Sequence, residues 1–165
     1  MNLFHILLLF IGVFLGYLLR KKGKVVGSIS YRIYNTLTSK GIPVNIAFLA
    51  VAQAKHETAM KGIPFTSPLF LRANNAYGYG TVKNNPLQIG TAGKHPEDSG
   101  VYAKYETVEK SAEDLAGYLK RRKHMWETIT TPDSYATFLK NQKYFTGPLE
   151  HYISGLNKFY TKSMS

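Results

Sequence analysis

The 165-residue chain contains no cysteine and few acidic residues. The absence of cysteine excludes a disulfide, a thiolate metal site and a lipoprotein anchor. Only 10 Asp and Glu stand against 21 Lys and Arg, so the net charge is +11. This charge favours an anionic partner, which is a cell-wall polymer, a membrane surface or nucleic acid. No motif supports nucleic-acid binding, so we do not expect nucleic acid as the partner.

The scarcity of acids also singles out Glu57, the only acidic residue in the first 96 positions. Glu57 ends an apolar run, and at helical spacing it shares one face with Ile46, Leu49, Ala50 and Gln53. A carboxyl group at the edge of a buried face, near the negative end of a helix, is biased towards its protonated form. A glycosidase needs such an acid to protonate a leaving oxygen. The alternative is a half-buried glutamate paired with a Lys or Arg.

One long apolar run covers residues 3–19 and is followed by Arg20, Lys21 and Lys22. Its length is near the minimum for a helix that spans a bilayer. No basic residue precedes it and no small-x-small cleavage site is present, so we expect an uncleaved, single-pass anchor in residues 1–24. The positive-inside rule places the rest of the chain in the cytoplasm, whereas an enzyme of the bacterial wall needs the opposite side. Alternatively, the protein is carried in a membrane-containing virus particle and reaches the wall from outside the cell.

The remaining pattern predicts a mainly helical fold. We expect a linker and a short helix in residues 25–42, and one domain in residues 43–165. Asn45 is the expected N-cap of the helix that carries Glu57, and Thr107 is the expected N-cap of a later helix. Prolines 64 and 68 indicate a loop after the Glu57 helix. Helices are expected at 31–39, 46–57, 107–123, 132–139 and 149–160, with an irregular wing near 76–105 that includes a strand at 102–105.

A metal site is not expected. His56 and Glu57 begin like the zinc motif H-E-x-x-H, but the fifth position is Met60. Zinc needs a second histidine on the same helical face, and none lies close by. The pattern therefore excludes a zinc protease of this type, and we expect no metal or organic cofactor.

Several short motifs occur in an order that matches one family. They are Glu57-Thr58, Ser67-Pro68-Leu69, Asn74-Asn75-Ala76-Tyr77-Gly78, an aromatic segment at 102–105 leading into a helix with Ser111, and Tyr144-Phe145-Thr146 followed by Tyr152. In this order they resemble the glucosaminidase-like family of bacterial wall hydrolases (glycoside hydrolase family 73). The resemblance covers roughly residues 43–160.

The resemblance implies a lysozyme-like helical fold in which glycan lies across a groove between a helical lobe and a small wing. It implies that Glu57 is the general acid. It also implies a turn built from Asn75, Tyr77 and Gly78, and a groove tyrosine at Tyr144. The expected glycan-binding residues are Asn75, Tyr77, Tyr79 and Tyr144.

The chain departs from the family pattern after the acid, where Thr58, Ala59 and Met60 replace a tight glycine turn. The identity of the second catalytic carboxylate is also left open by the sequence. Glu97 is the first choice and Asp98 the second, to activate water or to steady the developing cation. Alternatively, both are solvated loop acids, and the substrate's own N-acetyl group or 6-hydroxyl replaces them.

These observations predict a membrane-anchored peptidoglycan hydrolase that cleaves β-1,4 bonds of the amino-sugar backbone. Its expected partners are peptidoglycan strands and, through residues 3–19, a lipid bilayer of a bacterial envelope or a virus particle. Two alternatives stay open. One is a non-catalytic glycan-binding or scaffold module of an envelope or virion. The other is a lytic transglycosylase with a single glutamate.

Overall fold

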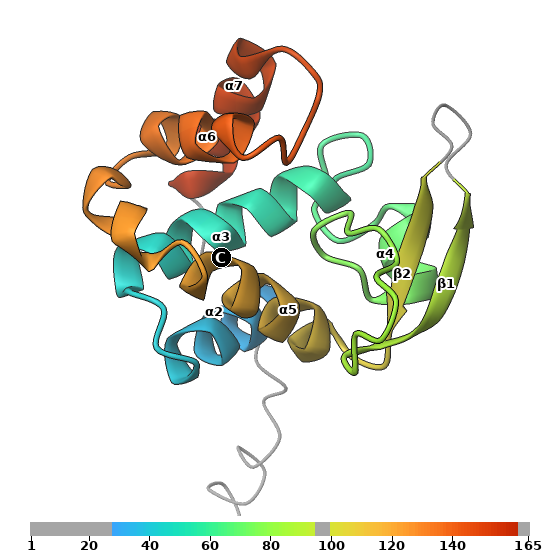
Figure 1. Cartoon of the computed structure of the whole chain (residues 1–165). Coiled ribbons are helices and arrows are strands. Elements are labelled where there is room, and N and C mark those ends of the chain that lie inside the picture. The colour runs from blue at the N-terminus through green and yellow to red at the C-terminus, as the bar shows by residue number, and fades with distance from the viewer. Residues whose placement is uncertain (1–27, 95–99, 162–165) are drawn as a thin grey trace, which may run out of the picture.

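A computed structural model of the chain describes residues 28–94 and 100–161. Within these ranges the protein is mainly helical, with one two-stranded sheet at its edge (Figure 1). This confirms the predicted helical fold with a small β wing. None of the helices in these ranges has the length and apolar character that a membrane span requires. The anchor predicted in residues 3–19 lies outside the described residues.

Most helices follow the predicted pattern closely, but the 3-10 helix at 123–128 was not predicted as a separate element. Two predicted segments also differ. Residues 68–73 form a short helix where a loop was predicted, and the helix after Thr107 ends at Lys120 rather than at 123. The elements are α2 (Ile29–Ser39), α3 (Val44–Thr58), α4 (Pro68–Ala73), β1 (Gln88–Lys94), β2 (Val101–Tyr105), α5 (Val108–Lys120), the 3-10 helix η1 (Lys123–Thr128), α6 (Pro132–Asn141) and α7 (Leu149–Tyr160).

Helix α3 forms the centre of the core. It is buried almost all round between Ile46 and Lys55, as expected of a helix that is apolar on every face. Helix α2 packs against α3 and α5, while α7 packs against α3 and α6 (Figure 1). The last turn of α3, which carries Glu57, therefore has a fixed position relative to both groups of helices.

Local caps explain several helix starts. Thr107 caps α5, as predicted, because its side chain accepts a hydrogen bond from the backbone N–H of Lys110. Ser67 caps α4 in the same way, and Pro68 occupies the first turn. The prediction that Asn45 caps α3 is wrong. Helix α3 begins at Val44, and the Asn45 side chain donates to the carbonyl of Ile129 at 3.0 Å.

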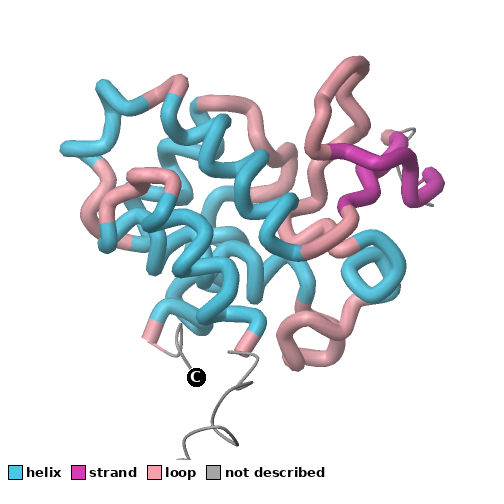
Figure 2. Tube along the Cα trace, turned by 90° about the horizontal axis from the view of Figure 1, so that it is seen from below, coloured by secondary structure: helices cyan, strands magenta, loops and turns pink. Residues whose placement is uncertain are grey.

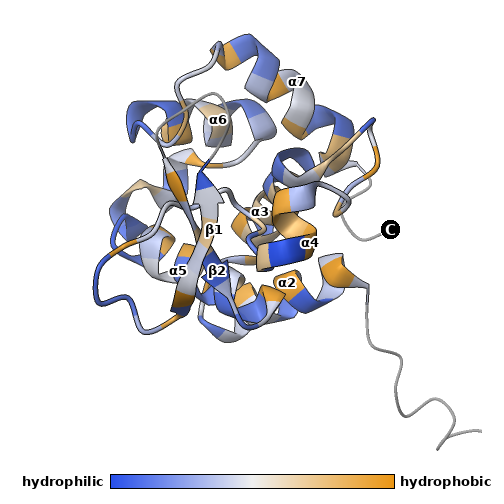
Figure 3. Cartoon of the chain, turned by 90° about the vertical axis from the view of Figure 1, so that its right-hand side faces the viewer, coloured by the Kyte–Doolittle hydropathy of each residue, from blue (hydrophilic) through white to orange (hydrophobic). Residues whose placement is uncertain are grey.

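The wing consists of β1 and β2, which pair antiparallel with two irregularities in their register. Ala103 and Tyr105 of β2 are fully buried, whereas most of β1 is exposed. Figure 2 shows the strands at one edge of the molecule, beside the helices. Helix α4 contacts both strands, and Figure 3 shows this side of the protein. The wing and α4 thus form one wall beside the end of α3.

Candidate functional site

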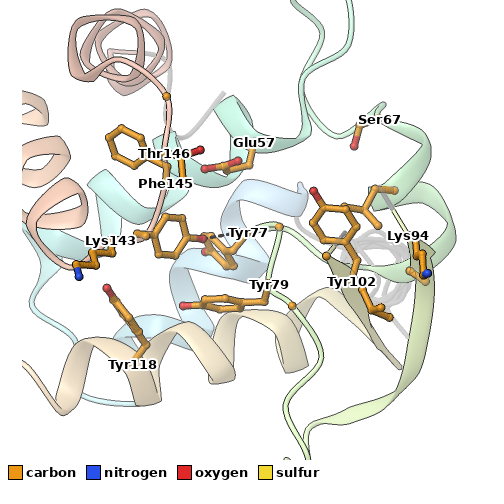
Figure 4. Close-up of a pocket in the computed structure, with 18 of the residues that line it drawn as sticks. Glu57, Ser67, Tyr77, Tyr79, Lys94, Tyr102, Tyr118, Lys143, Phe145 and Thr146 are labelled. Carbon is orange, nitrogen blue, oxygen red and sulfur yellow. Dashed lines mark hydrogen bonds between the residues drawn. The ribbon is translucent and has the colours of Figure 1, made fainter. Parts of the chain in front are cut away.

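A pocket of about 960 Å³ lies where the end of α3, the wing and the connection between α6 and α7 meet. Its lining comes from segments that are far apart in the sequence. They are Glu57 of α3, Ser67 to Leu69 and Arg72, the turn 77–80, Ala92 and Lys94 of β1, Gly100 and the start of β2, Tyr118 of α5, and residues 142–147. Figure 4 shows Glu57 between two ends of the pocket, one near Tyr118 and Lys143 and the other near Ser67 and Lys94.

Glu57 is half-buried at the pocket wall. Burial raises the pKa of its carboxyl group to about 7, because the charged form loses water, and a hydrogen bond from Tyr152 opposes part of this rise. The predicted bias towards the protonated form is therefore confirmed. Among the described residues, no Lys or Arg forms a salt bridge with Glu57. At pH 7 about half of such carboxyl groups hold a proton.

Tyr152 of α7 orients the acid. Its hydroxyl donates to Glu57 Oε1 at 2.5 Å. The Tyr152 ring stacks on Phe145 with 3.9 Å between ring centroids, and the His56 ring meets it edge-on at 4.9 Å. Since both neighbours restrict the ring, the hydroxyl is held at one oxygen of the carboxyl group.

The close approach of α7 to α3 depends on Gly155. A Cβ atom at this position would lie 2.2 Å from the ring of His56, which is far below a normal contact. Only glycine leaves room for the imidazole between the two helices. Gly155 therefore sets the distance at which Tyr152 reaches Glu57.

Gly78 lies beside Glu57, in a backbone conformation that favours glycine. Its φ is +63°, in the left-handed region that favours glycine, and a Cβ there would lie 3.8 Å from Glu57 Oε2. A glycine was expected here from the family resemblance. In the structure it brings the turn close to the carboxyl group.

Three of the four predicted glycan-binding residues line the pocket, namely Tyr77, Tyr79 and Tyr144. Asn75 is buried, and it is not part of the lining. Its amide group donates to the carbonyls of Tyr79 and Ala103, and its oxygen accepts from the backbone N–H of Tyr79. Asn75 therefore shapes the turn that presents Tyr77 and Tyr79.

The tyrosines form one connected wall. The Tyr144 hydroxyl donates to the backbone carbonyl of Tyr77. The Tyr144 ring meets the rings of Tyr79 and Tyr118 edge-on, with centroids 5.8 Å and 5.9 Å away. This wall offers flat apolar surfaces and polar edges beside Glu57, a combination common in ligand pockets.

Several pocket residues were assigned no functional role from the sequence. They are Arg72, Lys94, Tyr102, Tyr118, Gln142 and Lys143. Tyr152 was noticed only as part of a motif and received no role. A tyrosine one turn from the N-terminus of an amphipathic helix carries no signal of its own, because the same pattern suits a core residue.

The predicted second acids, Glu97 and Asp98, lie outside the described residues, and their role stays a prediction. Among the described lining residues Glu57 is the only acid, while Arg72, Lys94 and Lys143 carry positive charge. The described part of the pocket is thus suited to an anionic or polar ligand that receives a proton from Glu57.

Comparisons with models of protein families, with curated proteins and with solved structures found no match to this chain.

Proposed function

We propose that this protein is a glycosidase that cleaves β-1,4 bonds in the amino-sugar backbone of peptidoglycan. The observation that carries the proposal is the state of Glu57, a carboxyl group at a pocket wall with a pKa raised to about 7 by burial. Such a group holds a proton at neutral pH and can deliver it to a leaving oxygen. The tyrosine wall beside it suits sugar rings.

In the proposed reaction the Glu57 carboxyl group donates its proton to the glycosidic oxygen. The bond between this oxygen and the anomeric carbon breaks, and the leaving sugar departs as an alcohol. Positive charge develops at the anomeric carbon. Water then attacks this carbon and loses a proton to a base, for which Glu97 and Asp98 remain the proposed residues.

A lytic transglycosylase is the second candidate, because Glu57 is the only acid among the described lining residues. In this reaction the 6-hydroxyl of the same amino sugar attacks the anomeric carbon. Its proton passes to the Glu57 carboxylate, which restores the acid and closes an anhydro ring. One carboxyl group suffices for both proton transfers.

The test is to incubate the full-length protein with purified peptidoglycan and to identify the soluble fragments by mass spectrometry. We expect fragments from the wild type and none from Glu57→Gln. Glu127→Gln is the matched control, because Glu127 is exposed and its replacement removes the same charge. Reducing glucosamine ends identify a glucosaminidase, reducing muramic ends a muramidase, and anhydro ends a transglycosylase. Wall binding without products from either form would favour the non-catalytic glycan-binding or scaffold module.

We further propose that residues 3–19 anchor the enzyme in a bilayer, in a bacterial envelope or a membrane-containing virus particle. The support is the apolar run followed by Arg20, Lys21 and Lys22. Protease treatment of intact spheroplasts decides the orientation. Digestion of the domain from outside would place it on the side of the wall, and protection would place it in the cytoplasm.

A further inference from the structure

The turn that follows α3 presents two apolar side chains to solvent. Met60 and Ile63 form an antiparallel bridge, in which the backbone N–H of each donates to the carbonyl of the other, at 3.1 Å and 3.0 Å. Paired residues of a hairpin carry their side chains on the same side, so these two lie together. Met60 is 46% exposed and Ile63 is 61% exposed. The pair is thus a small apolar surface that the described residues leave open to solvent.

This turn is held in a fixed shape. Lys61 and Gly62 link the pair, and both have a positive φ, of 51° and 79°, as in the tightest hairpin turns. A lysine in this backbone region is uncommon. The Thr66 hydroxyl donates to the carbonyl of Ile63 at 2.7 Å and accepts from the backbone N–H of Met60 at 3.3 Å. The fold therefore holds the apolar pair at the surface.

The turn has no part in the pocket. None of the residues 59–66 belongs to the pocket lining. They follow Glu57 at the point where the chain departs from the family pattern. The exposed pair therefore needs an explanation other than the proposed chemistry.

The surroundings of the pair are positively charged. Lys61 is exposed, and Nζ of the exposed Lys158 in α7 lies 3.3 Å from where a Cβ atom on the turn glycine would lie. Neither lysine forms a salt bridge with a described residue. The chain has no acidic residue between 58 and 96, and the acid that contacts this end of α7 is Asp133, which accepts a hydrogen bond from Asn157. An apolar pair beside two such lysines suits an anionic bilayer surface.

The turn also lies on the side of the molecule where the described chain begins. Figure 2 shows the segment after α3, the start of α2 and the end of α7 along one side, and Figure 3 shows the same arrangement. The proposed anchor in residues 3–19 ends nine positions before residue 28 (28 − 19 = 9), where the description starts. Nine residues reach at most about 32 Å. The anchor would therefore keep this side of the domain close to the bilayer.

We propose that the turn 60–63, together with Lys158, docks on the surface of an anionic bilayer. Met60 and Ile63 enter the boundary between headgroups and acyl chains, while Lys61 and Lys158 contact the lipid phosphates. The anchor and the turn then act as two points of attachment, which fix the orientation of the domain on the bilayer. The proposal rests on the proposed anchor and is independent of the glycosidase reaction.

The experiment follows one probe on the full-length protein. The chain has no cysteine, so Ile63→Cys introduces a single thiol for the fluorophore nitrobenzoxadiazole. The protein is reconstituted in phosphatidylglycerol liposomes with lipids that carry a nitroxide on the acyl chain, which quench a probe that reaches the bilayer. Val82→Cys is the matched control, because Val82 is 59% exposed and the segment that leads into β1 lies on the opposite side in Figure 3. We expect quenching by lipid at position 63 and none at position 82.

Charge and apolar contact are then tested separately with the probe at position 63. Lys61→Gln and Lys158→Gln should each lower the ratio of docked to free turn about fivefold, the amount expected for one lysine at an anionic surface, and Met60→Ser should lower it by a similar factor. Phosphatidylcholine in place of phosphatidylglycerol should lower it by more than either lysine substitution. Lys83→Gln is the matched control and should have no effect, because Lys83 lies in the segment before β1. All four side chains are exposed, so their replacement does not disturb the core.

The possible failures are distinct. Equal quenching at positions 63 and 82, in protein that floats with the liposomes, would overturn the docking and leave the anchor intact. Protection of the probe at position 63 from acrylamide, a water-soluble quencher, without quenching by lipid would mean that protein covers the turn, for example a second copy of this chain, and would also overturn the docking. Protein that does not float with the liposomes would overturn the anchor and the docking together. Release of fragments from peptidoglycan is measured separately, so none of these results decides the glycosidase proposal.

Discussion

The raised pKa of Glu57 predicts an unusual dependence of stability on pH. In the unfolded chain the carboxyl group loses its proton near its ordinary pKa of 4.5, whereas in the folded protein it holds the proton up to about pH 7. The folded state therefore binds more protons between these two values. The stabilisation that Glu57 gives to the folded state is therefore fully present below about pH 4.5. It is lost as the pH rises to about 7.

The size of this loss follows from the two pKa values. A difference from 4.5 to about 7 corresponds to about 3 kcal/mol. Because Glu57 lies at a pocket wall and is only half-buried, solvent lowers this figure, and we expect about 2 kcal/mol. Glu57→Gln removes the ionisation and keeps an oxygen that can accept from Tyr152. The substitution should be nearly neutral at pH 4 and should stabilise the protein by about 2 kcal/mol at pH 8.

Urea unfolding of full-length wild type and Glu57→Gln at pH 4, 6 and 8, with mild detergent throughout, measures the difference. Glu127→Gln serves as the control and should show no such trend, because Glu127 is exposed. A Glu57→Gln difference that stays constant from pH 4 to pH 8 would mean that Glu57 has an ordinary pKa. The argument that it acts as a neutral-pH acid would then fail.

Three further substitutions test how the site is held. Tyr152→Phe removes the donor to Glu57, so the pKa of Glu57 should rise further, and its carbon-13 titration should move up by about 1 pH unit. Gly155→Ala places a Cβ against the His56 ring and should destabilise the protein by about 1–3 kcal/mol in urea unfolding. Asn75→Asp cannot donate to the two carbonyls that Asn75 now serves, and it should lower the free energy of unfolding at pH 7 by about 2–3 kcal/mol.

Each of these three substitutions has a control, which is the same type of substitution at a position that lacks the contact being tested. Tyr31→Phe should leave the Glu57 titration unchanged, because Tyr31 lies on the exposed side of α2. Gly147→Ala should cost little, since a Cβ there would meet nothing within 4 Å. Asn35→Asp should change stability only slightly, because Asn35 is at an exposed position of α2. A Glu57 titration in Tyr152→Phe equal to that of the wild type would contradict the role of Tyr152. Losses of stability in Gly155→Ala or Asn75→Asp no larger than in their controls would contradict the roles of Gly155 and Asn75.

Local patterns in the sequence were enough to predict most of the helical fold. Apolar spacing predicted α2, α5, α6 and α7 within a few residues, and Thr107 was recognised as a cap. These features depend on residues three or four positions apart, so short segments carry the information. The helix at Ser67-Pro68 had a local signal too, but the neighbouring glycine and prolines led to the prediction of a loop.

The sequence by itself also singled out Glu57, because an acid at the end of an apolar helix is bound to lose water on folding. What surrounds this acid was decided by the tertiary structure alone. Tyr152 reaches it across 95 positions of sequence, and Gly155 sets the helix spacing that permits the contact. Tyr118 joins the pocket only because α5 passes beside the tyrosine wall. Such contacts depend on how all the helices pack together, and no short segment of the chain encodes that arrangement.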